Sequence, residues 1–125
     1  MFKGIEHIGI YSNDTAALKN WYIEMFGFEQ VYDNGKGTFF LKAPDGSMME
    51  FVSAQSDGGV IGDKVSGIRH IALSVDNFEE CYDMLMNAKV EVVSDAVISP
   101  KGPKIFFFRD LDGNVLHLIY RSSPL

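Results

Sequence analysis

Gly4-Ile5-Glu6-His7-Ile8 opens the chain, and Gly67-Ile68-Arg69-His70-Ile71 repeats it at the midpoint with one substitution. The two histidines lie 63 residues apart (70 − 7) in a chain of 125 residues. A repeat of about half the chain length predicts two copies of one structural module. The fold is therefore expected to be built twice from the same order of elements.

A second repeat lies near the end of each half. The stretch from Phe40 to Phe51 matches the stretch from Phe108 to Leu118 once one residue is skipped in the hairpin. Glu50 then falls on His117, at an offset of 67 (117 − 50). The two repeats together define two kinds of position, each used twice, and these are occupied by His7, Glu50, His70 and His117.

Three imidazoles and one carboxylate can coordinate a divalent metal ion, and Zn, Ni, Co, Fe and Mn are all chemically admissible. Strand alternation places each of the four on a face whose other side chains are apolar or small, so each is expected to point inward. A buried carboxylate is costly without a partner, and a shared metal would supply one for Glu50. The repeat therefore predicts a metal site at a pseudo-twofold axis between the halves. The alternative is a pocket that has these residues but binds no metal.

The composition is that of an ordinary globular protein, with 46% apolar and 22% charged residues. A net charge of −6 argues against nucleic acid as a partner. No apolar run approaches the roughly 20 residues that span a bilayer, and no signal-peptide pattern opens the chain. Cys81 is the single cysteine, so no intrachain disulfide is possible. These features favour one cytoplasmic domain with neither nucleic acid nor a membrane as its partner.

The first module, residues 1–54, is expected to follow the order β-α-β-β-β. Asn13 or Asp14 can cap a helix at its N-terminus, and Gly27 stands where a left-handed C-cap belongs. Asn34-Gly35 and Asp45-Gly46 are hairpin signals. The expected elements are a strand over 4–11, a helix over 14–26, and strands over 28–33, 37–43 and 47–54.

Residues 55–66 contain a run of serine, aspartate and glycine and are expected to link the modules. The second module, residues 67–125, repeats the order, with Asp76 or Asn77 as the helix cap. Its loop over 94–104 contains Pro100 and Pro103 and is a candidate lid or specificity loop. The expected elements are a strand over 67–75, a helix over 77–88, and strands over 90–94, 104–109 and 114–120.

A doubled β-α-β-β-β module, with a histidine at the start of each half and an acid or histidine near each half's end, resembles the vicinal oxygen chelate superfamily. This superfamily includes glyoxalase I, fosfomycin-resistance proteins, extradiol dioxygenases and bleomycin-binding proteins. The resemblance covers the whole chain. It implies an α+β fold in which two tandem modules form a glyoxalase-like open barrel around a central metal. Its most specific parts are Ile5-Glu6-His7-Ile8, Trp21-Tyr22, Phe26-Gly27-Phe28, the stretch from Ile68 to Val75 and the stretch from Phe108 to Asn114.

Carried over by position, the resemblance implies that the metal ligands are His7, Glu50, His70 and His117. The glyoxalase I pattern matches at the first three positions and differs at His117, where glyoxalase I carries a second glutamate. The implied function is that of a glyoxalase-type lyase or isomerase, similar to lactoylglutathione lyase. Such an enzyme chelates vicinal oxygens of a small substrate and moves a proton through an enediolate. Glu50, the carboxylate of the set, is the expected catalytic proton shuttle.

Two other functions remain open. One is a different enzyme of the same superfamily, either an iron-dependent dioxygenase or an antibiotic-modifying thiol transferase. The other is a metal-free protein of the bleomycin-resistance type that binds an aromatic or drug-like ligand. Members build the site inside one chain or across a dimer, and a homodimer is expected here.

Overall fold

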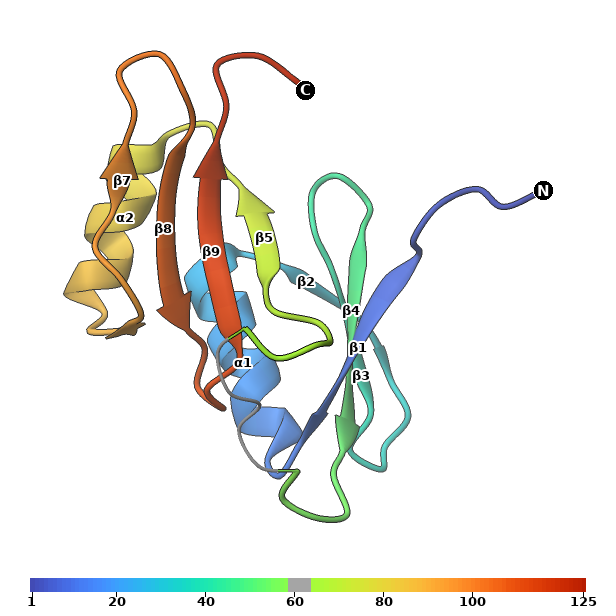
Figure 1. Cartoon of the computed structure of the whole chain (residues 1–125). Coiled ribbons are helices and arrows are strands. Elements are labelled where there is room, and N and C mark those ends of the chain that lie inside the picture. Colours follow the sequence, from blue (N-terminus) through green and yellow to red (C-terminus); the bar gives the residue numbers. More distant parts are fainter. Residues whose placement is uncertain (59–63) are drawn as a thin grey trace. The chain divides into compact units, whose positions relative to one another are not determined.

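A computed structural model describes residues 1–58 and 64–125 (Figure 1). The chain forms two compact units, Met1–Val60 and Ile61–Leu125, and each is described by itself. We refer to them as the first and the second unit. The expected linker over 55–66 includes residues 59–63, which lie outside the described part of the chain.

The first unit contains one helix and a four-stranded sheet. In the sheet the order is β1-β4-β3-β2, with β1 parallel to β4 and the other neighbours antiparallel. Because β1 pairs with the last strand rather than with the next one, the start and the end of the module lie side by side. The elements are β1 (His7–Ser12), α1 (Thr15–Phe26), β2 (Glu29–Asp33), β3 (Phe39–Lys42) and β4 (Met48–Ser53).

The second unit repeats this arrangement with one addition. Its sheet has the order β5-β9-β8-β6, again with a parallel pair formed by the first and last strands, and β7 also pairs with β8. The short strand β7 lies inside the loop expected over 94–104, so part of that loop is an ordered sheet edge. The elements are β5 (Ile71–Ser74), α2 (Phe78–Asn87), β6 (Glu91–Val92), β7 (Val97–Ile98), β8 (Lys104–Arg109) and β9 (Val115–Tyr120).

Local signals fix both helix starts and one helix end. Asp14 accepts a hydrogen bond from the Ala17 backbone N–H at 2.9 Å, and Asn77 accepts one from Glu80 at 3.2 Å. Each therefore satisfies a backbone donor that the helix itself leaves unpaired. Gly27 ends α1 in the left-handed conformation, with φ of 67°. After α2 the left-handed residue is not a glycine but Lys89, with φ of 58°.

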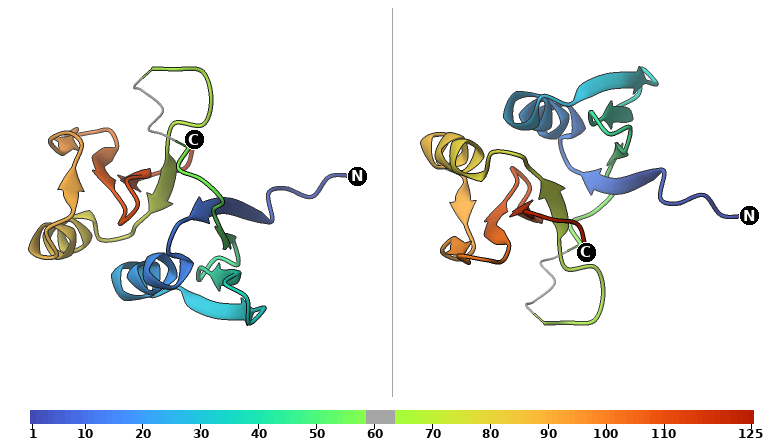
Figure 2. Two further views of the ribbon diagram at one scale, coloured as in Figure 1. Left: turned by 90° about the horizontal axis from the view of Figure 1, so that it is seen from below. Right: turned by 90° about the horizontal axis from the view of Figure 1, so that it is seen from above.

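Each helix packs on one face of its own sheet, as the two views of Figure 2 show. In the first unit α1 contacts β1, β3 and β4, and Tyr22 lies 5.1 Å from Phe51 between ring centroids. In the second unit α2 contacts β9. The large, fully buried side chains of the two cores are Leu18, Tyr22, Leu41 and Phe51 in the first unit, and Phe78, Leu85, Phe106, Phe108, Leu116 and Leu118 in the second.

The order β-α-β-β-β is thus present twice, in a mixed α/β fold with two sheets and two helices. Closure of the sheets into an open barrel around a metal stays a prediction. Within the described residues, neither helix combines the length and the apolar character that crossing a membrane would require.

Candidate metal centre

The first unit brings two of the four predicted ligands together. His7 is the first residue of β1, and Glu50 lies on the neighbouring strand β4, where its register partner is Gly9. Nε2 of His7 lies 3.9 Å from Oε1 of Glu50. Two ligands on one ion, with bonds of about 2.1 Å, lie roughly 3–3.5 Å apart. A small movement of either side chain would therefore place both on one metal.

The second unit pairs the other two predicted ligands. His70 directly precedes β5, and His117 lies on β9 opposite Ala72. The two imidazole rings are 4.5 Å apart between centroids and meet edge to face at 65°. Gly9 faces Glu50 and Ala72 faces His117, so the offsets of 63 and 67 residues in the sequence are also those of the sheet register.

The structure therefore presents the predicted site as two pairs, one in each unit. Within the described ranges, 1–58 and 64–125, no group of three or more His, Cys, Asp or Glu side chains is gathered as a metal site would need. The four-ligand centre stays a prediction. What the fold supplies is a backbone that presents each pair at an equivalent place of its sheet.

The four predicted ligands differ in exposure, and the inward position expected of all four stays a prediction for the first unit. The His7 side chain is 37% exposed and that of Glu50 is 27% exposed, whereas Met49 and Phe51 on the opposite face of β4 are buried. Both faces of this strand carry apolar residues, so alternation alone could not show which face packs against the helix. His117 agrees with the expectation, since only 8% of it is exposed.

Burial and nearby positive charge hold the second pair in the neutral form. Desolvation, followed by the charges of His70, Arg69 and Arg121, lowers the pKa of His117 to about 4. Desolvation also lowers the pKa of His70, helped by the adjacent Arg69. A neutral imidazole has the free lone pair that a metal ion or a proton donor requires. Both lowered pKa values thus favour the uncharged rings that metal coordination requires.

One buried atom of this pair lacks a partner. Nδ1 of His117 is buried and accepts or donates no hydrogen bond among the described residues. A buried polar atom left in this state normally costs about 1–3 kcal/mol. The donor set of three imidazoles and one carboxylate, together with this unpaired nitrogen, fits a divalent ion of the Zn, Ni, Co, Fe or Mn group.

Two phenylalanines that the sequence argument missed accompany the ligands. Phe40 pairs in register with Glu50, and Phe107 pairs with His117. Each receives the edge of the nearby histidine: the centroid distance is 5.3 Å both for His7 and Phe40 and for His70 and Phe107. The sequence alignment started its second stretch at Phe108, whereas the sheet register matches Phe40 with Phe107, at the same offset of 67 (107 − 40) that relates Glu50 and His117.

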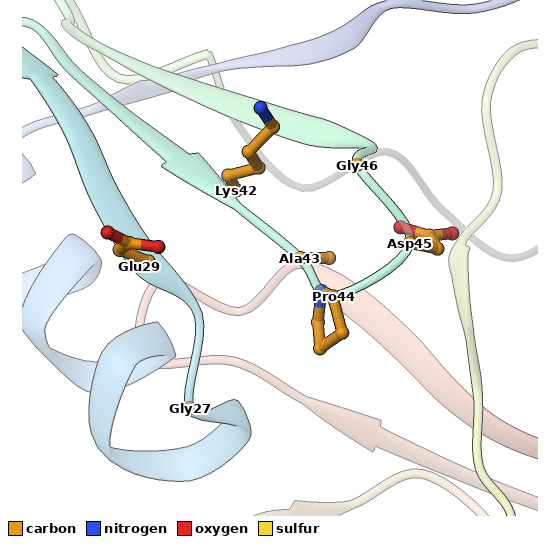
Figure 3. Close-up of a pocket in the computed structure, with 7 residues that line it drawn as sticks. All are labelled: Gly27, Glu29, Lys42, Ala43, Pro44, Asp45 and Gly46. Carbon is orange, nitrogen blue, oxygen red and sulfur yellow. The ribbon is translucent and has the colours of Figure 1, made fainter.

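A recess of about 460 Å³ lies elsewhere in the first unit (Figure 3). It is formed by the β3–β4 turn and the start of β2, and its charged side chains are Glu29, Lys42 and Asp45. None of the four predicted ligands lines it. The recess is therefore separate from the candidate metal centre.

Comparison with protein families gives one match over most of the chain. The model of the Glyoxalase/Bleomycin resistance protein/Dioxygenase superfamily matches residues 4–118. No curated protein sequence matched the chain.

Solved structures with similar folds cover nearly the whole chain at low identity. A glyoxalase/dioxygenase from Nostoc punctiforme has a TM-score of 0.82 and 13% identity, over 97% of this chain and 92% of that one. A lactoylglutathione lyase from Agrobacterium tumefaciens has a TM-score of 0.71 and 19% identity, over 94% and 92%. A mutant of the fosfomycin resistance protein FosX from Listeria monocytogenes, complexed with Mn(II) and a dihydroxypropylphosphonic acid, has a TM-score of 0.75 and 18% identity, over 100% and 94%.

Proposed function

We propose, since the chain belongs to the glyoxalase/bleomycin resistance protein/dioxygenase superfamily, that it is a metal-dependent enzyme of the glyoxalase type. The proposal takes the two pairs as ligands of one divalent ion, within one chain or across a homodimer. The ligands are His7, Glu50, His70 and His117. The substrate is a small molecule with two adjacent oxygens, and the reaction moves a proton, as in a lactoylglutathione lyase-like lyase or isomerase.

The observation that carries the proposal is the equivalence of the two pairs in register. Glu50 and His117 occupy the same place in their sheets, each opposite a small residue of the parallel strand and beside a phenylalanine of the antiparallel one. Both units therefore present a side chain that can bind a metal at the same place, next to a histidine that lies in the parallel strand or directly before it. A bound divalent ion would polarise the two substrate oxygens and stabilise the negative charge that develops there.

The chain's own residues have separable roles in this proposal. His70 and His117 are neutral ligands that add no charge to the site. Glu50 is the carboxylate of the set, and its side chain is partly accessible, so it can reach a substrate proton. Glu50 therefore takes the proton from one carbon and returns it to the next. A positioned base of this kind contributes about 10²–10⁴ to a rate.

Elemental analysis of the purified protein tests the metal. We expect close to one divalent ion per site in the wild type after reconstitution with Zn, Ni, Mn or Fe, and loss of that ion in a His7→Ala/His70→Ala variant. The identity of the bound metal directs the assays, because iron would favour the dioxygenase alternative. Equal metal content in wild type and variant, or none in either, would contradict the proposal.

Substitution of Glu50 by glutamine tests the proton shuttle. Glutamine keeps the shape and one oxygen donor but cannot take a proton, so Glu50→Gln is expected to retain part of the metal and to lose turnover by about 10²-fold or more. The assay is conversion of a glutathione hemithioacetal by the reconstituted protein. Glu24→Gln, on the exposed side of α1, is the matched control and should stay active. Wild-type turnover in Glu50→Gln would exclude the role.

The second candidate is a metal-free binding protein for an aromatic ligand. It is favoured by the aromatic row on the ligand-bearing face of the first unit, where Tyr32 lies 5.8 Å from Phe40 and Phe40 lies 5.3 Å from His7. Tyr32 is 52% exposed and so available for stacking. Binding of an aromatic drug to metal-stripped protein with unchanged affinity, together with failure of metal reconstitution, would select this function.

A further inference from the structure

The residue before each histidine is the one that differs between the two copies of the repeated pentapeptide. It is Glu6 in the first copy and Arg69 in the second. Both reach the same atom of the histidine that follows. Oε1 of Glu6 lies 3.0 Å from Nδ1 of His7, and Nη1 of Arg69 lies 3.3 Å from Nδ1 of His70. Both copies of the repeat thus have a side-chain contact to Nδ1, but the contacting group is an anion in the first copy and a cation in the second.

The two contacts require opposite hydrogen positions. An ionised carboxylate can only accept a hydrogen bond, so Nδ1 of His7 must carry the hydrogen that it donates to Glu6. A guanidinium can only donate, so Nδ1 of His70 must present its lone pair to Arg69. A neutral imidazole carries one hydrogen on its two nitrogens. Nε2 therefore has a free lone pair in His7 and carries the hydrogen in His70.

In the first unit, the free lone pair of His7 is on the nitrogen that faces Glu50, the other predicted ligand of that unit. Nε2 of His7 is the nitrogen that lies 3.9 Å from Oε1 of Glu50. Histidines that bind metals usually donate the other ring N–H to a carboxylate or a carbonyl, which fixes the ring and strengthens the ligand. Glu6 supplies that support. In the second unit the guanidinium of Arg69 also lies over the Phe107 ring, 4.6 Å from Cζ to the centroid, which keeps it close to His70.

We propose that Glu6 and Arg69 are positioning residues that give His7 and His70 opposite tautomers. Glu6 holds His7 as a ready metal ligand, whereas Arg69 withholds Nε2 of His70 until the guanidinium leaves Nδ1. This inference rests on the proposed function in that both histidines serve the metal. The ion therefore binds first to the first unit. Coordination by His70 is a separate, later step, which the hydrogen bond from Arg69 opposes.

Nitrogen-15 NMR of the metal-free, full-length protein at pH 8 tests the tautomers directly. Long-range proton–nitrogen correlations distinguish a ring nitrogen that carries hydrogen from one that does not, and His7→Gln and His70→Gln variants assign the signals. We expect the hydrogen on Nδ1 in His7 and on Nε2 in His70. The same tautomer in both rings of the wild type would overturn the proposal.

Reciprocal exchange separates this role from a merely structural one. Glu6→Arg should move the hydrogen of His7 to Nε2, and Arg69→Glu should move that of His70 to Nδ1. Glu6→Gln is the conservative variant: its amide oxygen still accepts the hydrogen bond, so it should keep the wild-type tautomer, whereas Glu6→Leu should not. If the tautomers of His7 and His70 stay the same in these variants, Glu6 and Arg69 do not determine them, and the proposal is wrong.

Metal affinity gives the second readout, measured by Zn(II) titration against a chelating indicator. Partners of this kind typically change affinity by about 10–100-fold, so we expect Glu6→Leu to weaken binding by at least tenfold and Arg69→Glu to strengthen it. Glu6→Gln should keep most of the affinity, which a pure charge effect would not allow. If the tautomers follow the exchange and no variant binds Zn(II), the hydrogen-bond assignment stands and the proposed metal function fails.

Discussion

Replacing His117 with leucine should stabilise the metal-free protein while destroying its metal site. His117 is 8% exposed, and its Nδ1 has no hydrogen-bond partner among the described residues. Leucine removes that unpaired buried atom, which is worth about 2 kcal/mol. It also removes the stacking of His117 on Phe107, at 4.6 Å between centroids, which is worth about 1 kcal/mol. The net gain in unfolding free energy is therefore about 1 kcal/mol.

Urea denaturation in the presence of a chelator at pH 8 measures this difference. With a denaturant slope of about 1–2 kcal/mol per molar, the midpoint of His117→Leu should rise by roughly 0.5–1 M. With metal added at about 100 times its dissociation constant, the wild type should gain about 2.7 kcal/mol. The variant should gain far less because it has lost a ligand.

His7→Leu is the matched control. His7 is a predicted ligand on the exposed face, so its replacement should change metal-free stability by no more than about 0.5 kcal/mol and still remove the gain from metal. Two results would refute the reasoning. A metal-free His117→Leu protein less stable than the wild type would show that the unpaired nitrogen is not a burden, and a full metal response in that variant would show that His117 is not a ligand.

Two further predictions concern pH and a helix end. Because the pKa of His117 is lowered to about 4 in the folded state, the unfolded chain binds more protons between about pH 6.5 and 4. Metal-free stability should therefore fall by up to about 3 kcal/mol as the pH drops through that window, and urea midpoints in His117→Leu should fall less; parallel curves for the two proteins would contradict this. Lys89 holds a φ of 58° after α2, so Lys89→Gly should raise the unfolding free energy by about 0.5–1 kcal/mol. Gly27→Ala, at the left-handed residue after α1 with φ of 67°, should lower it by about 1 kcal/mol, and thermal melts that move both variants in one direction would argue against backbone strain as the cause.

Short-range features were predictable from the sequence. The C-cap at Gly27 lies where the sequence placed it, and Asp14 and Asn77 are each one of the two N-cap candidates that the sequence offered. Such caps are predictable because they depend on residues close in the sequence. The equivalence of Glu50 and His117 followed from the repeat, because a duplicated module has one register. The grouping of the four residues as one pair in each unit was not part of the sequence prediction. The end of the second helix lies within one residue of the predicted bound, but the left-handed conformation of Lys89 after it was not predicted, because no glycine marks that position.

Features that depend on contacts between distant residues were harder to predict. Strand alternation divides β4 into two faces but does not choose between them, because Met48 and Val52 on one are as apolar as Met49 and Phe51 on the other. Only packing against α1 decides, and it buries the face opposite Glu50. The strand β7 was not predicted for a related reason. Two apolar residues, Val97 and Ile98, are too few to indicate a strand, and they form one only because they pair with β8.

Duplication gives this chain a way to change its chemistry without changing its architecture. Glu50 and His117 are presented by the same register, between a small residue and a phenylalanine, so a carboxylate and an imidazole are interchangeable as far as the backbone is concerned. A single codon change in one half alters the charge of the donor set, while the other half preserves the original. If the proposed metal site exists, the two modules can therefore diverge one donor at a time, and its metal preference can change while the backbone that presents the donors is kept.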